Sequence, residues 1–165
     1  MATLLFDDGR EATPDDLARL ARTHHIVVEH HPVPAELESL LQQPLLDRHA
    51  EEQLLSAIPP RPEFPARDLI VLHPDRPDNK QLATKFESWH RHGGDEIRHI
   101  LDGAGIFGVI VDERRAELHV APGDFIVVPA GLEHNFRLTS TRRIKALRYL
   151  SDAGGWAAEF TGRAA

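Results

Sequence analysis

The chain has 165 residues, of which 41% are hydrophobic and 27% are charged, and it contains no cysteine. This composition predicts one globular domain, and it excludes disulfide bonds and thiolate metal sites. The net charge of −7 and the scattered basic residues argue against a nucleic-acid partner, and no apolar run is long enough to span a membrane. We therefore expect a cytoplasmic protein.

The N-terminal part, residues 1–66, is predicted to be a mainly helical flank. Segment 13–16, Thr-Pro-Asp-Asp, combines a capping hydroxyl, a proline and two acids, which is the pattern of a helix start. A short helix should follow it to about Arg22. The leucine spacing predicts two further helices, over 35–42 and 45–57.

Extended segments separate these helices from the rest of the chain. The run 26–30 is rich in β-branched residues and predicts a strand. A proline-rich connector over 58–65 then leads into the second half, because each proline removes a backbone donor and restricts its predecessor. A strand over 68–73 and a short helix over 78–86 follow.

From Glu96 to about Leu150, short apolar runs alternate with turn signals, which is typical of an antiparallel β-barrel or sandwich. We therefore predict a mainly β fold in a single domain over 1–165. Its barrel core would cover 67–150, with the short N-terminal helices packed on the outside and a C-terminal segment over 151–165.

The strongest functional signal is a cluster of imidazoles and a carboxylate. His90, His92 and Glu96 occupy even positions, and an extended chain directs even positions to one side. Antiparallel pairing can bring His134 opposite to them. Imidazole and carboxylate ligands suit Fe, Ni, Mn or Zn, and four protein ligands leave two positions open on an octahedral ion. The pattern predicts a metal site with room for catalysis or ligand binding.

Two arginines lie close to this cluster in the strand pattern. Arg98 continues the parity of Glu96 and should point inward beside it. It either pairs with an acid as a structural bridge or faces a negatively charged substrate. Arg148, on the same strand face as Ile144 and Ala146, leaves the same two alternatives open.

These motifs resemble the signature of the acireductone dioxygenase family, cupin-fold enzymes of the methionine salvage pathway. The pattern HxHxxxExR is present as His90, His92, Glu96 and Arg98, and segment 123–134, GDFIVVPAGLEH, ends in His134. The similarity extends over about 68–163 and includes Asp68 to Leu72, Pro77, Lys85-Phe86, Arg148, Gly155-Trp156 and Phe160-Thr161-Gly162.

The resemblance implies an enzyme that opens the enediol of an acireductone with O2, using one Fe(II) or Ni(II) per chain. In the family, the iron form yields the keto acid precursor of methionine and formate, whereas the nickel form also releases carbon monoxide. Arg98, assisted by Arg148, would balance the negative charge of the enediolate. Phe107, Phe136 and Trp156 would line the pocket for the apolar methylthio tail.

The chain departs from the family's pattern at Trp89 and Gly94, where acids are common. The general base would then be Asp95 or a hydroxide on the metal. The sequence leaves open a non-catalytic cupin that binds a metal and a small molecule, a metal-dependent isomerase, and a dioxygenase for another enediol or a β-diketone. It does not decide between a monomer and a small homo-oligomer.

Overall fold

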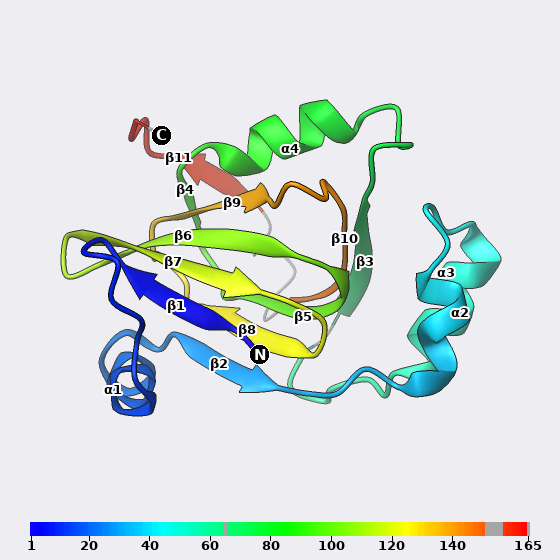
Figure 1. Cartoon of the computed structure of the whole chain (residues 1–165), viewed down its shortest axis with the longest axis horizontal. Helices are drawn as coiled ribbons and strands as arrows, with labels where there is room; N and C mark the ends of the chain where they lie inside the picture. Colours follow the sequence, from blue (N-terminus) through cyan, green and yellow to red (C-terminus); the bar gives the residue numbers. More distant parts are fainter. Residues whose placement is uncertain (65, 151–156, 165) are drawn as a thin grey trace.

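Two antiparallel β-sheets that face each other form the body of the molecule in the computed structural model, which describes residues 1–64, 66–150 and 157–164 (Figure 1). Sheet A has the strand order β1 (Thr3–Phe6), β7 (Arg114–Val120), β6 (Gly105–Val111), β9 (His134–Leu138), β4 (His90–His92) and β11 (Ala158–Phe160). Sheet B has the order β2 (Val27–His30), β8 (Asp124–Val128), β5 (Glu96–Gly103), β10 (Ile144–Leu150) and β3 (Ala66–Leu72).

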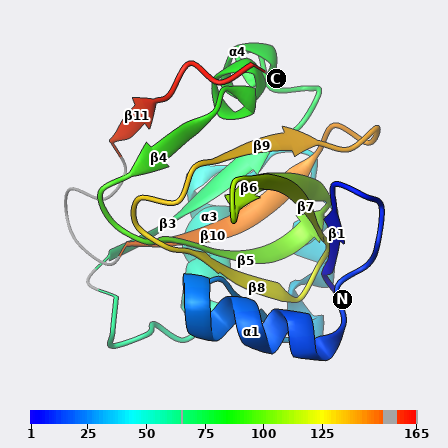
Figure 2. The same cartoon turned by 90° about the vertical axis from the view of Figure 1, so that its left-hand side faces the viewer.

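The helices lie outside the sheets, as Figures 1 and 2 show. They are α1 (Pro14–His24), the 3-10 turn η1 (Ala35–Leu37), α2 (Glu38–Leu41), α3 (Arg48–Ala57) and α4 (Asn79–Glu87). Helices α2 and α3 cover the outer face of sheet B, whereas α4 contacts β9 of sheet A. None of the helices in the described part of the chain is long and apolar enough to cross a membrane.

Strand β5 shows how one segment serves two apolar cores. Ile100 points between the two sheets, where it joins a core that includes Phe107 and Leu118 of sheet A. Ile97 and Leu101 point the other way, into a second core under the helices. This alternation follows from the pleat of a strand, and it places Glu96, Arg98 and Ile100 inside the sandwich.

The predicted mainly β, cupin-type fold is confirmed, with small shifts at the helix ends. Helix α1 begins after Thr13, whose side chain caps it in a capping box, and it extends to His24 rather than to Arg22. Helix α3 begins at Arg48 rather than at residue 45. The reason is the Asp47 carboxylate, which accepts the Ala50 N–H at 2.8 Å and so fixes the start of the helix.

Two edge strands were not predicted. Strand β1 pairs with β7, and β11 pairs with β4, each over a few residues that are too short to show an alternating pattern. The N-terminal part therefore contributes β1 and β2 to the sheets as well as helices to their outer surface.

Candidate metal centre

Four side chains from the two sheets meet at one point between them. His90 and His92 come from β4, His134 opens β9, and Glu96 opens β5 of the other sheet. One ligand atom of each lies within 4.8 Å of those of the other three. The structure thus brings together the four residues that the sequence predicted as ligands.

Backbone carbonyls fix the orientation of all three imidazole rings. His90 and His134 each donate from Nδ1 to the carbonyl two residues earlier, at 2.6 and 2.8 Å. His92 donates from Nδ1 to the distant carbonyl of Ala157 at 3.0 Å. With Nδ1 used in this way, Nε2 is the nitrogen of each ring that is left to bind a metal ion once it carries no proton.

The carboxylate of Glu96 is buried among positive and hydrogen-bonding partners. It lies 2.8 Å from Nε2 of His92 and forms a 2.9 Å ion pair with Arg98. Burial alone would raise the pKa of Glu96, but the attraction of Arg98 and the hydrogen bonds from His134 and His92 hold this pKa well below its usual range. Glu96 is therefore ionised and able to bind a cation.

The same surroundings shift the pKa values of two of the histidines in opposite directions. Burial lowers the pKa of His90, so this ring is neutral near pH 7. Burial also acts to lower the pKa of His92, but the hydrogen bond and the negative charge of Glu96 outweigh burial and raise it. In the metal-free chain, His92 therefore keeps its second proton to a higher pH than an ordinary imidazole, and a metal ion must displace that proton wherever it is bound.

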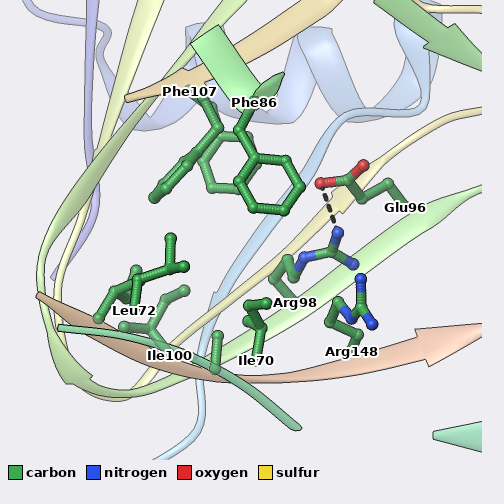
Figure 3. A pocket seen from close by; sticks show the side chains of 11 residues that line it. Ile70, Leu72, Phe86, Glu96, Arg98, Ile100, Phe107 and Arg148 are labelled. Atoms are coloured by element: carbon green, nitrogen blue, oxygen red, sulfur yellow. Dashed lines mark ion pairs between the residues drawn. The ribbon is translucent and has the colours of Figure 1, made fainter. Parts of the chain in front are cut away.

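The four residues line a cavity of about 240 Å³ that also contains several cationic side chains. These are Arg76, Lys85, Arg98 and Arg148. A narrow apolar recess of about 30 Å³ adjoins Glu96 and the last two arginines (Figure 3). It is lined by Ile70, Leu72, Phe86, Ile100, Phe107, Phe136, Ile144 and Ala146.

Both arginines face the cavity and also hold an acid. Arg98 pairs with Glu96, as the sequence analysis allowed (Figure 3). Arg148 forms two parallel hydrogen bonds to Asp68, at 2.7 and 2.5 Å, in the forked geometry that fixes a guanidinium plane. Each guanidinium is thereby held in place on the same side of the cavity as Glu96.

The other predicted site residues fall in different places. Phe107 and Phe136 line the recess, whereas Trp156 lies outside the described residues. Asp95 accepts a hydrogen bond from the Ala130 N–H at 2.9 Å and is not among the described residues that line the cavity. Lys85 also lines the cavity. No role was predicted for it from the sequence, although it lies within the segment that resembles the family.

Trp89, one of the departures from the family's pattern, points away from the metal centre. Its buried ring lies on the outer side of sheet A, 5.4 Å from the guanidinium of Arg115 and 5.9 Å from that of Arg163. Strand alternation explains this placement, because the neighbour of the inward His90 faces outward. A side chain at this position therefore takes no direct part in the cavity.

The sandwich and its converging side chains, three histidines and one glutamate, define a metal-binding protein of the cupin type. A family model described as the ARD/ARD' family matches residues 8–158. The chain belongs to this family, and it is a metal-dependent dioxygenase.

Individual relatives agree with this assignment. A Rhodopseudomonas palustris protein named acireductone dioxygenase is 77% identical over 165 residues, which is all of both chains. A namesake from Leptospira biflexa is 37% identical and covers 94% of this chain and 92% of its own. The solved structure of an acireductone dioxygenase from Bacillus anthracis, with cadmium in its active centre, shares the fold at a TM-score of 0.82 and 23% identity, over 97% of this chain and 98% of the other.

Proposed function

We propose that this chain cleaves an acireductone, an enediol with an adjacent ketone and a methylthioethyl tail, with O2. The observation that carries the proposal is the shared wall of the cavity, where the predicted ligand Glu96 adjoins two fixed guanidinium groups and an apolar recess. This arrangement suits a small anion with an apolar end. The name of relatives that match 100% and 94% of this chain supports the same substrate.

The proposed cofactor is one Fe(II) or Ni(II) ion per chain, held by His90, His92, Glu96 and His134. The donor set fits either ion, because imidazole and carboxylate are borderline and hard ligands and no thiolate is present. When bound, the ion supplies Lewis-acid polarisation of the substrate oxygens. In the proposal, its identity decides whether carbon monoxide is among the products.

In the proposal, Arg98 and Arg148 form a cationic wall of the cavity that balances the negative charge of the enediolate. Arg98 and Arg148 are pre-positioned by Glu96 and Asp68, so little reorganisation accompanies substrate binding. Phe107 and Phe136, whose rings pack at 4.9 Å, form part of the recess that would hold the methylthio tail. Trp156 remains a predicted third aromatic contact.

Asp95 remains the proposed general base, and its replacement tests that role. Asp95→Asn keeps the side-chain oxygen that accepts the Ala130 N–H but removes the basic carboxylate. Loss of a general base predicts a fall in kcat of roughly 10²–10⁴-fold with metal content unchanged. A wild-type kcat in this variant would instead favour a hydroxide on the metal as the base.

The biological setting proposed here is methionine salvage in the cytoplasm, with the substrate and O2 as partners. A direct assay tests the function itself: metal-free protein is loaded with Fe(II) or Ni(II), and O2 uptake is followed with a synthetic acireductone. We expect uptake above the uncatalysed rate with both ions, and carbon monoxide with nickel alone. Stoichiometric metal binding without uptake would instead support a binding module.

A further inference from the structure

The C-terminal strap, residues 157–164, borders the metal centre along the edge of β4 that faces away from β9. Within it, β11 pairs with β4 so that Ala158 lies opposite His92 and Phe160 lies opposite His90. Figure 2 shows the two strands side by side. On its other side, β4 pairs with β9 through a single residue pair, His90 and His134. The strap therefore provides most of the strand pairing that holds β4.

The strap also contacts the metal centre itself. Its first residue, Ala157, provides the carbonyl that accepts the Nδ1 hydrogen of His92 at 3.0 Å. His90 and His134 take their acceptors from their own chain segments, two residues upstream. His92 is thus the one of the three whose ring is oriented by a segment distant in sequence. Ala158 in addition lines the cavity.

Glu133 fastens the far end of this strap. One of its carboxylate oxygens accepts a hydrogen bond from the hydroxyl of Thr161, and the other accepts one from Arg163 at 2.7 Å. The backbone N–H of Thr161 donates to the carbonyl of Trp89 at 3.0 Å, directly before β4. Glu133 is only 12% exposed, so solvent competes weakly for these contacts.

We propose that Glu133 is a positioning residue for the metal centre. By holding Thr161 and Arg163, it keeps the strap on β4 and the Ala157 carbonyl against His92. Because a fixed Nδ1 acceptor sets the tautomer and direction of a metal-binding imidazole, the strap controls how tightly the centre holds its ion. This inference rests on the proposed metal site and not on the substrate.

The experiment measures the release of Ni(II) from the loaded full-length protein into excess EDTA. We expect Glu133→Gln and Arg163→Met each to accelerate release by roughly 10- to 100-fold, the range for loss of a partner behind a metal ligand. Glu159→Gln is the matched control, because Glu159 lies on the same strap but forms no ion pair among the described residues. Wild-type release rates in both test variants would overturn the proposal.

Two further comparisons separate positioning from a general loss of structure. Arg163→Met should accelerate release without lowering the denaturant midpoint of the metal-free protein, since it loosens the strap and not the core; acceleration that appears only together with a lowered midpoint would contradict positioning through His92. Arg163→Met also keeps the test valid if Glu133→Gln, adjacent to His134, fails to fold. Wild-type protein that binds one Ni(II) but takes up no O2 would refute the proposed reaction and leave this test unaffected.

Discussion

The two faces of sheet B share the same strands but differ in what they contribute. On the inner face, Glu96 and Arg98 of β5 and Arg148 of β10 line the cavity. The residues next to them, Ile97 and Leu147, are fully buried in the core under the helices. Since a one-residue slip in register would exchange the two faces, strand register sets both the site and the core. Function and stability should therefore respond separately to substitutions on the two sides.

The largest effect is expected where the cavity side loses a ligand. His134→Ala removes one of four donors and opens a void that water fills, so the protein should lose most of its bound metal and all detectable turnover. Elemental analysis after dialysis checks this. A variant with full metal stoichiometry would show that His134 is not a ligand.

The next effect concerns the cavity-facing guanidinium of β5. Arg98→Met keeps much of the side-chain volume but removes the charge beside Glu96, so metal should be retained while kcat/KM falls by roughly 10²–10³-fold. Arg98→Lys, which keeps the charge, should recover part of the loss. Steady-state kinetics on metal-loaded protein measures this loss. An unchanged kcat/KM would show that Arg98 serves only as a structural ion pair with Glu96.

The outer face should behave in the opposite way. Leu147→Ala creates a cavity between sheet B and its helices and should lower the free energy of unfolding by about 2–5 kcal/mol. Metal stoichiometry and kcat at 25 °C should remain those of the wild type. Denaturant unfolding gives the stability change, and a loss of metal affinity in folded Leu147→Ala would show that the two faces are coupled.

Much of this contrast was predictable from the sequence because strand geometry has a period of two. The even positions His90, His92, Glu96 and Arg98 were expected on one side, and the structure places them there. The turn signals likewise marked the β-rich half correctly. A regular backbone makes such inferences possible even without knowledge of the tertiary contacts.

The contacts that orient the site's side chains could not be predicted from the sequence, for a physical reason. The rings of His90, His92 and His134 are oriented by carbonyls, and every residue has a carbonyl, so no residue type signals this role. Arg148 meets Asp68 because β3 and β10 pair in a register that joins positions 80 residues apart. Such pairings depend on the whole fold.

A smaller, graded effect is expected when protons compete with the metal on the cavity side. The pKa of His92 is raised by Glu96, and a metal ion binds the neutral ring, so apparent Ni(II) affinity should fall as pH drops below that raised pKa. One competing proton predicts about tenfold weaker binding per pH unit there. Calorimetric titration between about pH 8 and pH 6 measures the slope. Constant affinity across this range would exclude competition at His92.

The smallest effect tests whether the cavity's charge reaches beyond its two arginines. Lys85 of α4 lines the cavity and forms no ion pair with an acid in the described part of the chain, whereas Arg76 is paired with Asp78. An unpaired cation at this position should attract an anionic substrate, so Lys85→Met should lower kcat/KM by about tenfold at low ionic strength and leave kcat unchanged.

The matched control for this last prediction is Lys80→Met, which removes an exposed charge from the same helix outside the cavity. Raising the salt concentration should abolish the difference between Lys85→Met and the wild type, because mobile ions screen attraction between solvent-exposed charges. Equal losses in the two lysine variants would assign the effect to net charge. A loss that persists at high salt would instead place Lys85 in direct contact with the substrate, and the cationic wall would then extend from sheet B to α4.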